Sequence, residues 1–182
     1  MIATDEALQE VFLNPGEFHF DGKGEKKNGA ESPTGKTRIS TLLGSCVSIT
    51  LWHPRRRIGG MCHYMLTERV RPQNIALDGR FANEAFELFL LQVAAAGTRP
   101  SEYQAKMFGG GNMLTGTKLG AQEIGLHNIE YGRYLLASKN IALMAEHVGG
   151  NGRRKLYFDV WSGEVWLAFP QGSGAQIRNW ND

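Results

Sequence analysis

A cysteine and a histidine seventeen residues apart are the side chains of this sequence best suited to covalent chemistry. Cys46 follows Gly44-Ser45 between two segments expected to be extended, where backbone N–H groups can be left unpaired and directed at one point. A thiol reacts as its thiolate, and a neighbouring imidazole can take its proton and later deliver it to a leaving amine. Cys46 and His63 therefore predict nucleophilic attack on a carbonyl carbon.

A predicted β-hairpin would bring these two residues together. Residues 47 to 53 alternate between apolar and other side chains, and residues 58 to 66 form a second run typical of a strand. Because the chain reverses at residues 54 to 57, His63 returns towards the end where Cys46 begins. The pattern does not specify the strand register, so this pairing is a hypothesis.

Each of these side chains also has a purely structural interpretation. Cys46 can be a small buried residue, and His63 can be a histidine satisfied at a strand edge. Strand alternation turns Cys62 away from His63, so we expect Cys62 in the core. A Cys46–Cys62 disulfide would block the chemistry but is disfavoured in a reducing compartment. A metal site built from these three residues and His53 lacks ligand spacing, so no metal or other cofactor is expected.

The remaining patterns predict one α+β domain over residues 1 to 182. Amphipathic spacing at Phe86, Phe89 and Val93 indicates a helix, and the coarse order is strands, helix, strand, helix, strands. The other expected segments are a strand pair over 8–20, a solvated loop over 21–36, extended segments over 38–53, a shorter helix with Ile124, Asn128, Tyr131 and Leu135 on one face, a strand over 141–148, a hairpin over 155–169, and a polar tail over 172–182.

Composition excludes several classes of function. With 182 residues, 42% hydrophobic and 21% charged, the chain has the balance of a globular domain. A net charge of +2 with scattered basic residues does not favour nucleic acid, and no apolar run approaches the roughly 20 residues needed for membrane insertion. The N-terminus lacks the build of a secretory signal, so we expect a cytoplasmic protein. The glycine runs lack the Walker ending and are expected to be turns.

Five short motifs, in order along the chain, resemble those of one protein family. They are Leu42-Leu43-Gly44-Ser45-Cys46-Val47, Gly59-Gly60-Met61-Cys62-His63-Tyr64-Met65-Leu66, Lys106-Met107-Phe108-Gly109-Gly110-Gly111-Asn112-Met113, Ile124-Gly125 with Asn128, and Val148-Gly149-Gly150 through Phe158-Asp159-Val160. In these motifs the sequence resembles the CheD family of chemoreceptor glutamine deamidases. The resemblance covers roughly residues 12 to 170, and five ordered motifs are more specific than any one of them.

The resemblance implies a layered α/β sandwich with mixed sheets and two main helices, similar to the catalytic domain of cytotoxic necrotizing factor toxins. It implies conversion of glutamine to glutamate on chemoreceptors, in bacterial chemotaxis, through a cysteine–histidine thioester mechanism. The family's nucleophile falls on Cys46 and its histidine on His63. The family's third catalytic member is a threonine six residues before the cysteine. Ser40 occupies that position here, with Thr41 beside it as the alternative.

The partners implied are the cytoplasmic domains of methyl-accepting chemoreceptors and a CheC-type phosphatase. An alternative function is a weakly catalytic or non-catalytic module that binds the phosphatase or the receptor. A cysteine peptidase would use the same pair of residues, but the sequence lacks the papain-type Cys-Trp pairing and distant histidine. Hydrolysis of glutamyl methyl esters is a further activity that the same chemistry permits.

Overall fold

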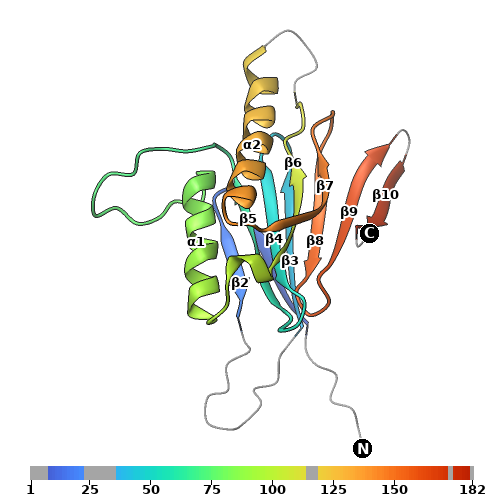
Figure 1. Ribbon diagram of the computed structural model, residues 1–182. Helices are drawn as coiled ribbons and strands as arrows, with labels where there is room; N and C mark the ends of the chain where they lie inside the picture. Colours follow the sequence, from blue (N-terminus) through green and yellow to red (C-terminus); the bar gives the residue numbers. More distant parts are fainter. Residues whose placement is uncertain (1–7, 23–35, 114–118, 172–173, 181–182) are drawn as a thin grey trace, which may run out of the picture.

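Two stacked β-sheets carry both helices on one outer face. The computed structural model describes residues 8–22, 36–113, 119–171 and 174–180. Figure 1 shows α1 (Ala82–Ala95) and α2 (Leu119–Ser138) side by side against one sheet, with the second sheet behind it. The predicted α+β class, with two main helices and mixed sheets, is confirmed. Within the described residues neither helix combines the length and apolar content needed to cross a membrane.

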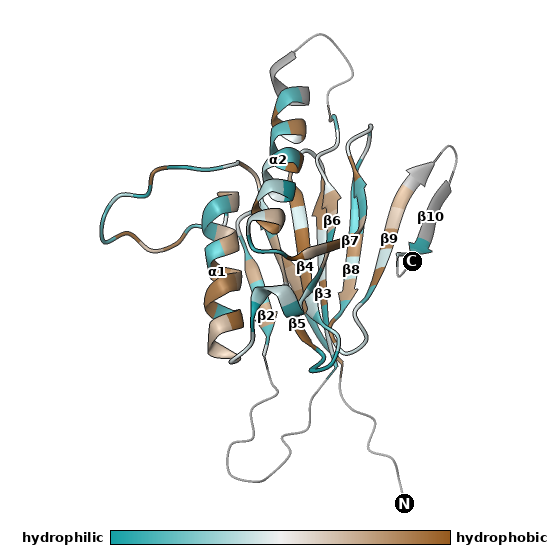
Figure 2. Ribbon diagram, in the orientation of Figure 1, coloured by the Kyte–Doolittle hydropathy of each residue, from teal (hydrophilic) through white to brown (hydrophobic). Residues whose placement is uncertain are grey.

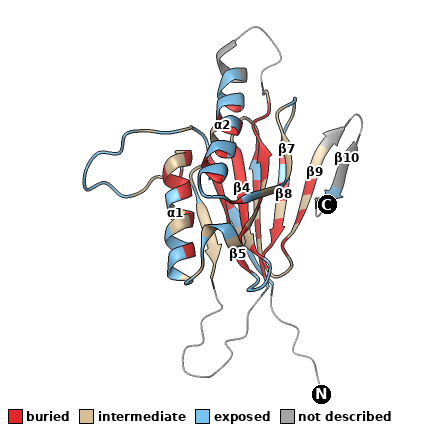
Figure 3. Cartoon of the chain, in the orientation of Figure 1, coloured by how far each residue is buried: buried red, intermediate tan, exposed pale blue. Residues whose placement is uncertain are grey.

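The sheet that carries the helices has the strand order β2-β5-β4-β6-β7. Its strands are β2 (Phe18–Asp21), β5 (Ile58–Tyr64), β4 (Val47–His53), β6 (Gln104–Gly109) and β7 (Ala142–Val148). β4 and β5 pair antiparallel, as the predicted hairpin requires, and β6 and β7 are the parallel pair joined by α2. Every residue of β5 is buried because both faces of this sheet are covered, and β4 is red in Figure 3 for the same reason.

The second sheet has the order β1-β3-β8-β9-β10. Its strands are β1 (Gln9–Leu13), β3 (Thr37–Leu43), β8 (Arg154–Asp159), β9 (Glu164–Gln171) and β10 (Gly174–Asn179). β3 and β4 are consecutive in the chain but lie in different sheets, so residues 44 to 46 cross from one sheet to the other. The predicted junction at Gly44-Ser45-Cys46 is therefore the point where the chain passes from one sheet to the other.

Two apolar clusters fill the space between the three layers. The helix-side core lies between the helices and the first sheet and includes Val47, Ile49, Cys62, Tyr64 and Phe89. The inter-sheet core includes Ile39, Leu43, Met61, Phe108 and Phe158. Strand alternation divides β5 between the two, since Cys62 faces the helices whereas Met61 faces the other sheet. The apolar residues in Figure 2 accordingly gather in the central strands.

The second helix is longer than its sequence pattern predicts, and one residue assigned to its buried face is in fact exposed. α2 has 20 residues, and Ile124 is exposed while Ile129 and Leu136 are buried. Glycines explain the error. A Cβ at Gly125 would lie 2.6 Å from the carbonyl oxygen of Gly110, so this glycine brings the helix close to the chain just after β6. Hydropathy periodicity counts apolar side chains and does not detect packing through glycine.

The predicted C-terminal tail is wrong for residues 174 to 179. They form β10, which pairs antiparallel with β9, so that Gly174 lies opposite Gln171 and Asn179 opposite Trp166. Backbone hydrogen bonds to a sheet edge do not require apolar side chains, so a polar composition does not exclude a strand at these positions. Most of the predicted loop over 21–36 lies outside the described residues, and its first residue, Asp21, ends β2.

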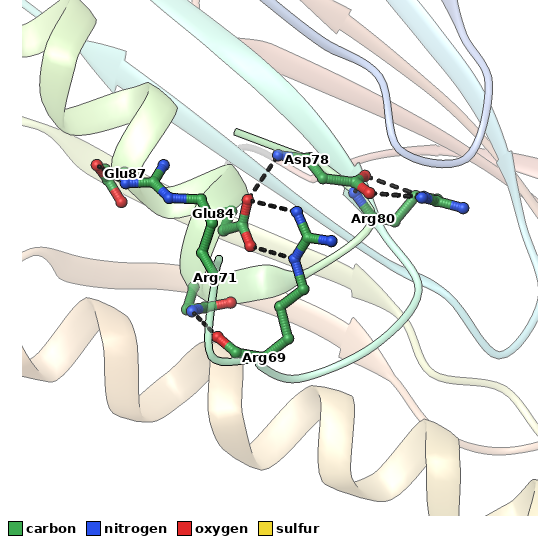
Figure 4. A network of polar contacts seen from close by, with 7 residues as sticks. Arg69, Arg71, Asp78, Arg80, Glu84 and Glu87 are labelled. Atoms are coloured by element: carbon green, nitrogen blue, oxygen red, sulfur yellow. Dashed lines mark hydrogen bonds and ion pairs between the residues drawn. The ribbon is translucent and has the colours of Figure 1, made fainter. Parts of the chain in front are cut away.

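The connection between β5 and α1 is held at its base by a buried carboxylate. Glu84, in the first turn of α1, accepts two hydrogen bonds from the Arg69 guanidinium, at 2.6 and 3.2 Å, and one from the Asp78 amide at 2.7 Å (Figure 4). These hydrogen bonds, that from Arg69 above all, hold the pKa of the Glu84 carboxyl below its usual value. The residues that follow His63 are thereby tied to the start of α1.

We predict that Glu84→Gln lowers the free energy of unfolding by about 2 kcal/mol, because the charge-assisted hydrogen bonds are lost while the shape is kept. The matched control is Glu87→Gln, which removes an exposed ion pair with Arg71 at 3.6 Å and should cost less than about 0.5 kcal/mol. Urea denaturation at neutral pH measures both. Equal midpoints for the two variants would contradict the prediction.

Candidate functional site

The predicted nucleophile lies on the segment that crosses between the sheets. Cys46 is half-buried and packs against the inter-sheet core. The carbonyl oxygens of this segment are occupied, because the amide of Gly110 donates to Cys46 at 2.8 Å and that of Gly111 donates to Gly44 at 2.8 Å. Among the described residues, the amides of Ser45 and Cys46 donate no backbone hydrogen bond. They are candidate donors for an oxyanion.

The two glycine runs support this segment. Gly109 and Gly110 have φ values of 113° and 64°, in the left-handed region that favours glycine. The runs are hydrogen-bonded to each other, since the amide of Gly149 donates to Gly109 at 2.9 Å and that of Asn112 donates to Gly150 at 2.7 Å. In place of the predicted turns, residues 109 to 111 are a strand end with two irregular residues, and residues 149 and 150 form a bend.

The predicted base lies on the same face of the sheet as Cys46. His63 on β5 is paired with Ser48 on β4, and Cys46 precedes Ser48 by two residues. Side chains two positions apart share a face, so Cys46 and His63 are diagonal neighbours across the strand pair, at a separation that longer side chains can bridge. Both face the second sheet. No hydrogen bond joins the thiol to the imidazole within the described residues.

One threonine hydroxyl determines which nitrogen of His63 carries the proton. Thr41 Oγ1 donates to the Leu13 carbonyl at 2.7 Å and lies 2.8 Å from His63 Nδ1. A carbonyl cannot donate, so the single hydroxyl proton is used there and Thr41 must accept from Nδ1–H. The lone pair of His63 is therefore on Nε2. That atom is buried and has no hydrogen-bond partner among the described residues.

The structure brings Thr41, and not Ser40, to the imidazole. Burial alternates along β3, and Thr41 is fully buried while Ser40 is half-buried. Neighbouring residues of a strand point to opposite faces, and only the face of Thr41 is turned towards the helix-bearing sheet. Of the two hydroxyls that the sequence left open, Thr41 makes the contact expected of the third member, and Ser40 belongs to the opposite face of the sheet.

Burial keeps both members of the predicted pair neutral. Desolvation lowers the pKa of His63 to about 4, against opposing effects of the Leu13 carbonyl and the Glu17 charge. Desolvation also raises the pKa of the Cys46 thiol, although the residue's own amide acts in the opposite direction. At neutral pH the resting site therefore holds a thiol and a neutral imidazole, which can act as a base but not yet as an acid.

An asparagine and a tyrosine hold the nucleophile segment against α2. Asn128 is buried, and its Nδ2 donates to the Met65 carbonyl at 2.8 Å and to the Ser45 carbonyl at 3.4 Å. Tyr64 donates its hydroxyl proton to the Asn128 backbone carbonyl at 2.7 Å. From the sequence, Asn128 is only part of a predicted helix face and of a motif. Its polar amide on an otherwise apolar face is the one sequence signal that it forms hydrogen bonds to neighbouring segments.

The other candidates from the sequence lie apart from this pair. Cys62 is buried in the helix-side core, as predicted, and Cys46 and Cys62 are both free thiols. His53 ends β4 at the opposite end from Cys46 and packs against Tyr103. No group of three or more His, Cys, Asp or Glu residues in the described part of the chain could hold a metal ion.

We predict that iodoacetamide modifies Cys46 and not Cys62 in the folded protein. Burial raises the pKa of Cys62 to about 12, whereas Cys46 is half-exposed. Because the pKa of Cys46 is also raised, its alkylation rate should increase with pH throughout the range from 6 to 9. Peptide mass mapping follows both sites, with a sample in urea as the control in which Cys62 reacts. A rate that is already at its plateau at pH 6 would contradict a neutral resting thiol.

Comparison with known proteins identifies the family. The family model described as CheD chemotactic sensory transduction matches residues 65–169, more than half of the chain. A Dechloromonas aromatica (strain RCB) protein named "Probable chemoreceptor glutamine deamidase CheD 3" is 70% identical over 179 residues, 98% of both chains. One from Pseudomonas savastanoi pv. phaseolicola, named "Probable chemoreceptor glutamine deamidase CheD", is 42% identical over 90% of this chain and 86% of its own. The chain belongs to the CheD family.

Proposed function

We propose that this chain is a protein-glutamine deamidase that converts glutamine to glutamate on the cytoplasmic domains of methyl-accepting chemoreceptors, in the cytoplasm. Cys46 is the nucleophile, His63 the base, and Thr41 the residue that positions the imidazole. The observation that carries the proposal is the buried His63 Nε2, which is left with a lone pair and faces the same side of the sheet as the Cys46 thiol. The printed names of the relatives support glutamine deamidation as the reaction.

The mechanism begins with a neutral pair. His63 Nε2 takes the thiol proton as Cys46 Sγ attacks the carboxamide carbon, and the oxyanion that forms accepts hydrogen bonds from the Ser45 and Cys46 amides. The C–N bond then breaks, and the imidazolium returns its proton to the nitrogen, which leaves as ammonia. Water, deprotonated by His63, attacks the thioester carbon. The C–S bond breaks, the imidazolium returns its proton to the leaving thiolate, and the glutamate side chain is released with the thiol restored.

The desolvated base determines when the proton moves. An imidazole whose pKa is about 4 is unprotonated at neutral pH, so its lone pair is available, but it is a weak base for a thiol whose pKa is raised. The proton therefore transfers as sulfur attacks and the oxyanion is stabilised, not beforehand. Once protonated in a buried site, the imidazole is a strong acid, which favours rapid delivery of that proton to the leaving nitrogen. Hydrolysis of a glutamyl methyl ester would follow the same steps with methanol as the leaving group.

A second candidate function is binding of a CheC-type phosphatase, with weak catalysis or none. The proposed enzyme and this binding module share one scaffold, for which we also retain the expected likeness to the catalytic domain of cytotoxic necrotizing factor toxins. The absence of a thiol–imidazole hydrogen bond among the described residues is the observation that favours weak catalysis. Such contacts can tighten only when substrate binds, so catalysis stays the first proposal.

Incubation with a chemoreceptor cytoplasmic fragment tests the proposed function. The native protein should raise the fragment mass by about 1 Da at specific glutamines and release one ammonia for each, because C–N cleavage replaces NH₂ by OH. Cys46→Ala should do neither, and Cys62→Ala is the matched control that should remain active. If the native protein binds the fragment or a CheC-type phosphatase but the fragment mass never changes, the binding module becomes the better account.

The choice between the two hydroxyls makes a separate prediction. Thr41→Val should lower kcat/KM about 100-fold, because His63 Nδ1–H loses its acceptor and the base tautomer is no longer enforced. Thr41→Ser should restore most of the activity, and Ser40→Ala should stay within about twofold of the native protein. Ammonia release measures all three. Loss of activity in Ser40→Ala, with Thr41→Val unaffected, would reverse the assignment.

A further inference from the structure

Three exposed apolar side chains belong to segments that meet residues 44 to 46. Met65, Leu66 and Met113 expose 37%, 44% and 37% of their surfaces. Exposed methionine and leucine side chains that lie together are typical of binding surfaces, where methionine adapts to different partners. We call these three residues the apolar rim.

Contacts of the crossing segment place the rim beside Cys46. A Cβ on Gly44 would lie 2.9 Å from Cγ of Met113, so the Met113 side chain covers the glycine two residues before the nucleophile. On the other strand, Asn128 Nδ2 holds the Met65 and Ser45 carbonyls together. The rim thus meets the crossing segment at two points, through the Met113 side chain at Gly44 and through Asn128 between the Met65 and Ser45 carbonyls.

A shallow hollow lies between α2 and the connection after β5. The hollow has a volume of about 370 Å³ and is lined by Thr67, His127, Glu130, Tyr131 and Tyr134. Thr67 follows the rim directly, and the lining residues of α2 flank Asn128 or lie one to two turns beyond it. Tyr134 is 63% exposed and its ring packs beside that of Tyr131. Exposed tyrosines are frequent anchors of protein interfaces.

We propose that the apolar rim receives the residues on either side of the target glutamine, and that the tyrosine-lined hollow receives a further side chain of the same polypeptide. This proposal rests on the proposed function and defines its substrate class: a polypeptide segment whose glutamine has apolar neighbours. Met113 covers Gly44 and Met65 is linked to Ser45 through Asn128, so a carboxamide at Cys46 brings the adjoining substrate atoms towards these two residues.

The same surface excludes free glutamine as a substrate. Its α-ammonium and α-carboxylate groups lie within a few bonds of the carboxamide, and they would be brought against apolar side chains that offer them no hydrogen bond. Charged groups that lose water without gaining a partner are strongly disfavoured. A peptide bond on each side of the glutamine removes both charges, so the rim selects glutamine within a chain.

A double variant, Met65→Ser with Met113→Ser, tests the rim. We expect kcat/KM for the receptor fragment to fall about 10- to 100-fold, since truncation of central apolar contacts has effects of this size. Alkylation of Cys46 by iodoacetamide should be unchanged, because so small a reagent does not need the rim. Val70→Ser is the matched control: Val70 is 97% exposed on the same connection, five residues after Met65 in the chain. It should retain the native kcat/KM.

The possible outcomes distinguish a failure of the proposed rim from a failure of the proposed function. Unchanged kcat/KM in the double variant, or an equal fall in kcat/KM in Val70→Ser, would overturn the proposed role of the rim in substrate binding. A fall in alkylation rate by the same factor as kcat/KM would also overturn it, since the methionines would then position the nucleophile segment. Leucine at both positions should restore activity, and free glutamine should release no ammonia. If the native protein releases no ammonia from the fragment, it is the proposed function that fails, and the rim fails with it.

Discussion

The hydrogen bond between Thr41 and His63 is the interaction on which the site depends, and it joins the two sheets. Thr41 belongs to β3 in one sheet and His63 to β5 in the other, so the contact forms only when the sandwich closes. The same threonine is tied to Leu13 on β1, which leaves its oxygen only the role of acceptor. Closure also removes water from the imidazole, which lowers the pKa of His63 and keeps the base neutral.

The second constraint is the crossing between the sheets at residues 44 to 46. A chain that leaves one sheet and enters another cannot keep all of its backbone groups in the ladders. Glycine amides at 110 and 111 satisfy the carbonyls of Cys46 and Gly44, whereas the Ser45 and Cys46 amides donate to no backbone acceptor in the described part of the chain. The fold thus provides backbone donors beside the thiol without a dedicated side chain.

A thiol held neutral at rest has a consequence for selectivity. Oxidation and alkylation both proceed through the thiolate, so the raised pKa of the Cys46 thiol slows both reactions near neutral pH. In the mechanism proposed above, activation depends on the arrival of the target amide at Cys46 and His63, and the rim of Met65, Leu66 and Met113 is the surface proposed to receive the residues around that amide. In this arrangement the same desolvation that restrains the nucleophile also strengthens the electrostatic interactions of the transition state.

The sequence by itself determined the local features: the hairpin that carries His63, the first helix, the core position of Cys62, and the ordered motifs of the family. These follow from side-chain periodicity and residue type within a few positions of one another. Only the tertiary structure decided between Ser40 and Thr41, because alternation along β3 fixes that the two point apart but not which face meets the other sheet. The length of α2, which packs through Gly125, and the strand β10, which depends on backbone pairing with β9, were decided in the same way, by neighbours distant in the chain.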